Sequence, residues 1–296
     1  MTDSAGRLTL APPFLRRLES LSLGSRRRLG SQGQGERRSH ARGSSLQLVD
    51  YRSYSPGDDL RQVDWNVYGR SGELWVRLYE DERSLTVHLL IDVSQSMDYG
   101  VPNKRAAALG LASALAYVTL SGYDRLQVGF LADRVVATAG PFWGRHQRSV
   151  ALGAIAAAPR ATRTDVAAGI GNYLDRVRQP ALLVLVSDLL SPTAADGVRR
   201  LASGRHEATI LHLLSPEELD PELAEDVQLV DRETGQSVDV SLDLATLATY
   251  RQRLADWSAR LGELCRGRDA RYLRLSTAED LERSMLQSLI RQGVLA

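Results

Sequence analysis

Three oxygen-bearing side chains follow one apolar run at alternate positions: Asp92, Ser94 and Ser96 come after residues 85–91. The apolar run predicts a buried strand of a parallel sheet. Ligands of open α/β sheets bind at the carboxyl ends of strands, and alternate spacing directs the three side chains to one point if the loop is extended. Carboxylate and hydroxyl oxygens suit Mg²⁺ or Mn²⁺, whereas softer metals prefer Cys or several His. The segment therefore predicts a divalent cation site.

Two later segments offer further oxygen ligands. Thr164 stands just before Asp165 and a helical pattern, and Asp188 directly follows the apolar run 181–187. We expect both segments to lie at the carboxyl edge of the same sheet. The predicted metal site therefore consists of Asp92, Ser94, Ser96, Thr164 and Asp188.

The order and placement of these five residues resemble the metal-ion-dependent adhesion site of von Willebrand factor A domains. The resemblance implies that the hydroxyls bind the cation directly or through water, and that the aspartates act mostly through water. One coordination position stays open for a carboxylate of a partner protein. Many A domains carry Gly-Gly-Thr in the threonine segment, whereas this chain has Ala161-Thr162-Arg163-Thr164, so Thr162 is an alternative ligand. We prefer Thr164 because the residues after it match the family.

A second signature precedes the first strand. Residues 51–65 read YRSYSPGDDLRQVDW, which closely resembles the hallmark of the bacterial domain of unknown function 58 family, with Val63 in place of the usual Ile. The resemblance extends from about Gly30 almost to the C-terminus and implies a von Willebrand A domain after the signature. The simpler interpretation of the charged signature residues is an ion-pair and capping network, and a partner-docking surface is the alternative. These residues are Asp58, Asp59, Arg61 and Asp64.

The remaining chain alternates between strand and helix patterns. Strands are expected at 85–91, 126–131, 182–186, 209–214 and 272–275. Helices are expected at 104–120, 148–158, 165–177, 194–201, 242–265 and 278–292. This alternation predicts an α/β fold with a doubly wound, mostly parallel sheet of Rossmann type, which is also the von Willebrand A architecture.

Three regions make up the predicted domain organisation. Residues 1–44 are rich in Arg, Gly and Ser and are expected to form a flexible basic arm, with a short helix near 8–23. Residues 45–84 form an antiparallel β unit that carries the Pro-Gly-Asp-Asp signature. Residues 85–296 form the A-like domain, with an inserted β-hairpin at about 217–241.

Composition favours an ordinary globular protein of 296 residues, with 43% hydrophobic residues and a formal net charge of +1. The single cysteine, Cys265, excludes an intrachain disulfide framework and fits a reducing compartment. No segment reads as a signal peptide or a membrane span, so we expect a cytoplasmic protein.

Competing chemistries lack their motifs. No Gly-x-x-x-x-Gly-Lys-Ser/Thr loop or Gly-x-Ser-x-Gly elbow occurs, and Gly169-Ile170-Gly171 lies inside a helical pattern, where close packing explains it. A Mg²⁺-dependent phosphoester or nucleotide hydrolase stays an alternative, although such sites collect more carboxylates. Residues 1–50 hold nine arginines, but they lack the interleaved aromatic rings of a nucleic-acid binder. Nucleic-acid binding through this basic arm is the other alternative function.

The sequence thus predicts a non-enzymatic, divalent-metal-dependent protein-protein interaction module. The cation, Mg²⁺ or Mn²⁺, would grip an acidic side chain of a client protein. The family resemblance also implies a partner, a MoxR-type AAA ATPase, and a chaperone-like adaptor role beside it. Neither nucleic acid nor an integral membrane span belongs to this expectation.

Overall fold

The computed structural model describes residues 11–25, 47–53, 63–80, 85–222, 224–231, 235–280 and 286–296. Contacts divide the chain into two compact units, one made of Met1–Gly30 with Leu85–Ala296 and the other of Ser31–Ser84. The signature residues Asp58, Asp59 and Arg61 lie outside the described residues, as do residues 1–10 and 26–44 of the predicted arm.

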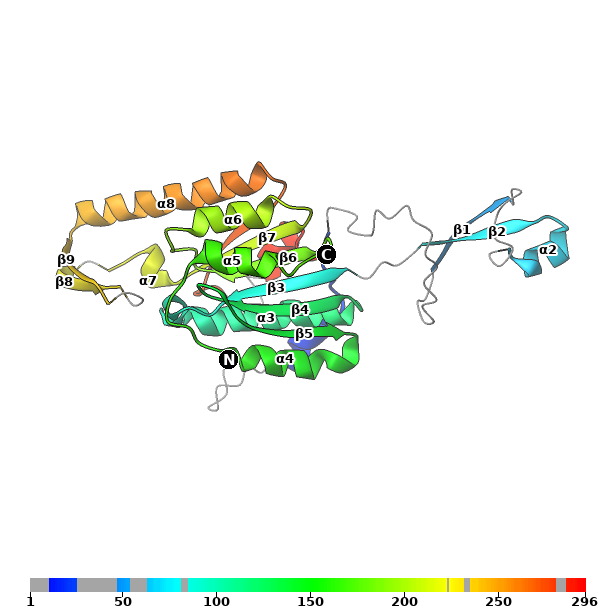
Figure 1. Ribbon diagram of the computed structural model, residues 1–296, viewed down its shortest axis with the longest axis horizontal. Helices are drawn as coiled ribbons and strands as arrows, with labels where there is room; N and C mark the ends of the chain where they lie inside the picture. Colours follow the sequence, from blue (N-terminus) through cyan, green and yellow to red (C-terminus); the bar gives the residue numbers. More distant parts are fainter. Residues whose placement is uncertain are drawn as a thin grey trace. The chain divides into compact units, whose positions relative to one another are not determined.

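The larger unit is built on a six-stranded sheet with the order β10-β7-β6-β3-β4-β5 (Figure 1). Every neighbouring pair is parallel except β4 and β5, which confirms the mostly parallel α/β fold. The strands are β3 (Thr86–Asp92), β4 (Arg125–Leu131), β5 (Val135–Trp143), β6 (Leu182–Ser187), β7 (Glu207–Leu214) and β10 (Arg271–Ser276). Strand β5 was not predicted from the sequence. Only Phe142 of that edge strand is buried, and the strand contains Gly140 and Pro141, so its pattern differs from that of a buried strand.

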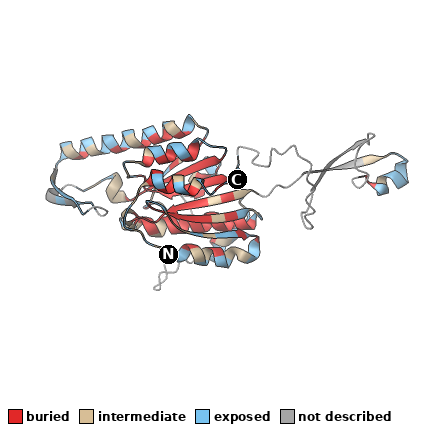
Figure 2. Cartoon of the chain, in the orientation of Figure 1, coloured by how far each residue is buried: buried red, intermediate tan, exposed pale blue. Residues whose placement is uncertain are grey.

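Helices cover both faces of the sheet (Figure 2). Alternate strand residues divide between two cores: Leu89 and Ile91 of β3 pack into one, and Leu90 packs into the other. The first core also takes side chains from α1 (Pro12–Glu19), α3 (Lys104–Ser121), α4 (Arg148–Ala156) and α9 (Leu286–Arg291). The second takes side chains from α5 (Val166–Leu174), α6 (Ala194–Ala202) and α8 (Leu244–Arg266).

Helix α1, which belongs to the predicted arm, packs against the first core. Its Phe14 and Leu18 are buried against the first core, and Leu23 forms an isolated antiparallel bridge with Leu295. The helix starts at Pro12 because proline suits the first helical turn, where its missing N–H costs no hydrogen bond. The described residues 11–25 thus form part of the packed larger unit.

The smaller unit pairs β1 (Gln47–Ser53) with β2 (Trp75–Glu80) as antiparallel strands. Between them lies a helix that the sequence analysis did not predict, α2 (Trp65–Ser71). Asp64 caps this helix by accepting hydrogen bonds from the amides of Asn66 at 2.9 Å and Val67 at 3.3 Å. The cap supports the structural interpretation of this signature carboxylate.

A two-stranded hairpin, β8 (Ala224–Val230) and β9 (Ser237–Leu242), leads from the sheet into α8. The predicted hairpin began too early, because residues 216–219 form the short helix α7 (Pro216–Leu219). The carboxylate of Glu218 and the hydroxyl of Ser215 close a capping box that starts this helix. Among the described helices, none combines the length and the apolar character needed to cross a membrane.

Candidate metal centre

Asp92 ends β3 and is buried, with 4% of its surface exposed. Its Oδ1 accepts a hydrogen bond from the amide of Ser94 at 3.0 Å, and its Oδ2 accepts one from the hydroxyl of Ser187 at 2.6 Å. Burial and, to a lesser extent, the nearby charge of Asp188 together raise the pKa of Asp92 to about 6, against the lowering effect of these hydrogen bonds. The two predicted aspartate ligands are therefore close enough to interact.

Ser94 and Ser96 bring their hydroxyls together, with the two Oγ atoms 3.0 Å apart. The condition of an extended loop is not met beyond Ser94, since residues 95–98 form a 3-10 helix that begins directly after it. The turn replaces alternate spacing as the reason why the hydroxyls converge. Ser94 is completely buried, whereas Ser96 lines a cavity.

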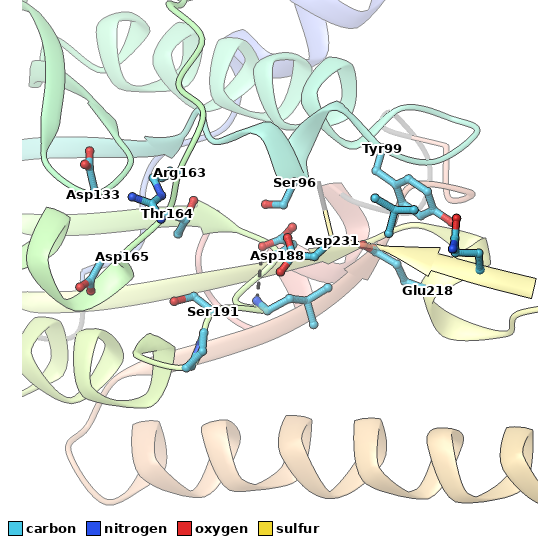
Figure 3. A pocket seen from close by; sticks show the side chains of 14 residues that line it. Ser96, Tyr99, Asp133, Arg163, Thr164, Asp165, Asp188, Ser191, Glu218 and Asp231 are labelled. Atoms are coloured by element: carbon cyan, nitrogen blue, oxygen red, sulfur yellow. Dashed lines mark hydrogen bonds between the residues drawn. The ribbon is translucent and has the colours of Figure 1, made fainter. Parts of the chain in front are cut away.

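Thr164 lines the same cavity as Ser96 and Asp188 (Figure 3). A second, much smaller cavity of about 10 Å³ is lined by both Thr164 and Asp92. The alternative ligand Thr162 is exposed and lines neither cavity. The structure thus brings Thr164, rather than Thr162, beside the other predicted ligands.

The loop before Thr164 is held by two groups that the sequence analysis did not identify. The guanidinium of Arg105 donates hydrogen bonds to the carbonyl oxygens of Ala158 at 2.6 Å and Pro159 at 2.7 Å. The amide of Ala161 donates to the carbonyl oxygen of Val93 at 2.9 Å, between the aspartate and serine ligands. These bonds fix the threonine loop against the loop after β3.

Asp188 follows β6 and is almost fully buried. Its Oδ1 accepts a hydrogen bond from the amide of Leu190 at 3.3 Å, and its Oδ2 lies 2.6 Å from Nζ of Lys104. The same ammonium lies 2.5 Å from Oε1 of Glu218. Burial opposes the charge of Lys104, but the carboxylates of Asp188 and Glu218 outweigh it and raise the pKa of the ammonium. Neither Lys104 nor Glu218 was predicted from the sequence as part of the site.

The cavity has a volume of about 830 Å³ and lies at the carboxyl edge of the sheet. Its position beyond β3 and β6 is the point where the strand order reverses, which is the usual ligand position in open α/β sheets. Five carboxylates and one guanidinium line it, so its potential favours a cation. The charged lining residues are Asp133, Arg163, Asp165, Asp188, Glu218 and Asp231.

The donors at the site are two carboxylates and three hydroxyls, all hard oxygen ligands of the kind that Mg²⁺ takes. Within the described part of the chain, no group of three or more His, Cys, Asp or Glu side chains could hold a metal ion. Any cation bound here would therefore depend on the hydroxyls of Ser94, Ser96 and Thr164.

Residues 50–260 match the family described as Protein of unknown function DUF58, and the chain belongs to this family. The uncharacterized proteins Rv1480 of Mycobacterium tuberculosis and Mb1516 of Mycobacterium bovis are each 29% identical to it over 238 residues. Each alignment covers 78% of this chain and 75% of the relative. The family predicted from the signature at residues 51–65 is thus confirmed.

Two solved structures from Bacteroides share a weaker likeness. The conserved hypothetical protein BatB of Bacteroides thetaiotaomicron aligns with a TM-score of 0.43 and 16% identity, over 71% of this chain and 98% of that one. An aerotolerance-related membrane protein of Bacteroides fragilis aligns with a TM-score of 0.43 and 14% identity, over 70% of this chain and 100% of that one.

Proposed function

We propose that this chain is a non-enzymatic protein-protein interaction module that acts through a divalent cation in a von Willebrand A-like domain. One observation carries the proposal. Ser96, Thr164 and Asp188 come from three loops far apart in the sequence, yet they line one cavity, and Asp92 shares a smaller cavity with Thr164. Together with Ser94 they are the residues that would form the metal-ion-dependent adhesion site.

The hydrogen bonds at the site indicate that few negative charges would bind a cation directly. Both oxygens of Asp92, and both of Asp188, already accept a hydrogen bond from the chain. The neutral hydroxyls would then be the main direct ligands of Mg²⁺ or Mn²⁺, with the aspartates acting mostly through water. A cation with few direct anionic ligands retains its attraction for an incoming carboxylate.

The acidic cavity makes metal dependence a strict requirement of this function. Without a cation, the carboxylates of Asp133, Asp165 and Asp231 would repel an acidic side chain of a partner. With a divalent cation at the site, the same side chain would have a ligand position to fill. We therefore expect partner binding to be lost, rather than weakened, when the metal is removed.

The histidines give little support to the alternative of a hydrolase. His88 contacts the hydroxyl of Tyr173 at 2.8 Å, and His212 contacts that of Tyr272 at 2.6 Å. Burial lowers the pKa of both imidazoles to about 4, and neither ring lines the cavity. These contacts favour structural roles over general base catalysis.

The partner carried by the family resemblance is a MoxR-type AAA ATPase, with this chain as its chaperone-like adaptor. To test this, the purified full chain is immobilised and the capture of a purified MoxR-type ATPase is measured in Mg²⁺ and in EDTA. Asp92→Ala and Ser94→Ala, measured in Mg²⁺, separate the role of this site from the ATPase's own need for metal. Thr162→Ala is the matched control, because this hydroxyl is exposed outside the cavity.

Capture that requires Mg²⁺, fails with both site variants and survives Thr162→Ala would support the proposal. Equal capture by wild type and Asp92→Ala in Mg²⁺ would remove the metal site from the interaction. Phosphate release from a nucleotide by the purified chain, abolished in Asp92→Ala, would instead favour the hydrolase. Salt-sensitive retention of an oligonucleotide by the full chain would favour the basic arm.

A further inference from the structure

Lys104 is the only lysine in the sequence, among 37 lysines and arginines. All other positive side chains, exposed or buried, are guanidinium groups. Arginine is planar and suits bidentate pairing with carboxylates, whereas lysine carries a compact point charge. Because every other basic residue is arginine, the single lysine indicates that position 104 suits a compact ammonium group rather than a guanidinium group.

The position itself explains this choice. Lys104 begins α3 and is completely buried, and its ammonium lies between the carboxylates of Asp188 and Glu218 at 2.6 and 2.5 Å. Asp188 is one of the five predicted metal ligands, and both carboxylates line the cavity. The chain thus supplies its own cation to the anionic wall of the site.

We propose that Lys104 is a fixed cation that sets the charge of the metal site and keeps its affinity for divalent ions low. This inference rests on the proposed function. The ammonium offsets one of the two aspartate charges, so a bound ion would depend more strongly on the carboxylate of a partner. Glu218 acts in the opposite direction, because it shares the ammonium and so reduces its effect on Asp188.

A purely structural ion pair would make a different prediction. Removal of either member of a structural pair disturbs the same wall, so both variants should weaken metal binding. If Lys104 sets the charge of the site, loss of the ammonium and loss of the Glu218 charge should change the metal affinity in opposite directions. Loss of the ammonium should tighten binding of a divalent ion, and loss of the Glu218 charge should weaken it.

The test is a Mn²⁺ titration of the full chain, with free Mn²⁺ followed by electron paramagnetic resonance. We expect Lys104→Met to bind Mn²⁺ at least about tenfold more tightly than wild type. A unit charge changes the energy of a nearby divalent ion by about this much even under water-like screening, and a buried charge is screened less. We expect Glu218→Gln, which retains an acceptor for the capping box, to bind several-fold more weakly. The exposed pair of Arg199 and Asp196 provides the control variant Arg199→Met, whose affinity should equal that of wild type.

The unique lysine also gives a spectroscopic test that needs no substitution at this position. With ¹⁵N-lysine labelling, one side-chain ammonium signal is expected, and saturating Mg²⁺ should shift it in wild type but not in Asp92→Asn. An unshifted signal in wild type at saturation would overturn the inference, and this result stands even if Lys104→Met fails to fold.

The two proposals fail in different ways. If wild type binds Mn²⁺ and Lys104→Met binds it equally or more weakly, the fixed-cation role is wrong and the proposed function stands. If neither protein binds Mn²⁺, both are wrong. Tighter binding by Lys104→Met together with weaker binding by Glu218→Gln is the result that supports the inference.

Discussion

The hydroxyl of Ser187 donates a 2.6 Å hydrogen bond to Oδ2 of Asp92 and so joins the ends of β6 and β3. Both side chains are buried, and Oδ1 of the same aspartate accepts the amide of Ser94. Asp92 therefore organises the loop after β3 through these two hydrogen bonds. Burial and the charge of Asp188 nonetheless disfavour the ionised form of Asp92. A bound cation would stabilise this ionised form.

Asp92→Asn tests this balance. The pKa of Asp92 is raised from 3.8 to about 6, so the free energy of unfolding of metal-free protein should fall as the pH rises through 6. At pH 7.5 in EDTA we expect Asp92→Asn to be more stable than wild type, by at most about 3 kcal/mol. Urea denaturation at pH 5 and 7.5 measures the difference. Added Mg²⁺ should stabilise wild type and not the variant, and equal stabilisation of both would contradict the assignment of Asp92.

Asp124→Asn separates the effect of pH from the effect of metal. Asp124 precedes β4, at the opposite edge of the sheet, and accepts the amide of Leu85 at 2.7 Å. Burial raises its pKa to about 6 as well, so its stabilising contribution is also lost as the pH rises through 6. We expect the variant to gain up to about 2 kcal/mol at pH 7.5 after allowance for its partial exposure. Its Mg²⁺ response should equal that of wild type, and a lost response would mean that the metal acts elsewhere.

Arg105→Met tests whether the threonine loop is positioned from α3. The substitution removes the two hydrogen bonds to the carbonyl oxygens of Ala158 and Pro159. We expect a loss of about 1.5–3 kcal/mol in the free energy of unfolding, because charged hydrogen bonds are lost. We also expect weaker Mn²⁺ binding, since Thr164 would be held less firmly. Arg160→Met is the control, because the side chain of Arg160 is largely exposed and its ion pair with Asp98 should contribute less than about 1 kcal/mol. Unchanged Mn²⁺ affinity in Arg105→Met would argue against this positioning role.

Gly169→Ala tests the packing that the sequence analysis offered in place of a phosphate-binding loop. A Cβ at Gly169 would lie 2.5 Å from the carbonyl oxygen of Ala132, so α5 must move away from the loop after β4. We expect a loss of about 1–3 kcal/mol in thermal or urea denaturation. Gly153→Ala in α4 meets no atom within 4 Å and should instead gain about 0.5–1 kcal/mol. Similar effects of the two substitutions would contradict this account of Gly169.

The sequence by itself determined the family, the order of the main strands and helices, and the alternation that places Leu89 and Leu90 on opposite faces of the sheet. It also predicted that Ser96, Thr164 and Asp188 would approach one another. These features depend on local periodicity, and on the rule that residues after parallel strands meet at one edge. Edge strand β5 and helix α2 could not be predicted in the same way, because exposed edge strands and short capped helices show only weak hydrophobic periodicity.

Only the tertiary structure decided which side chains complete the site. Asp92 and Ser187 are 95 positions apart, and Lys104 and Glu218 are 114 positions apart. Nothing in local sequence periodicity pairs such residues, because their contact depends on which strands become neighbours and on where α3 and α7 begin. The unusual lysine was visible in the sequence, but its meaning came from the two carboxylates that the fold placed around it.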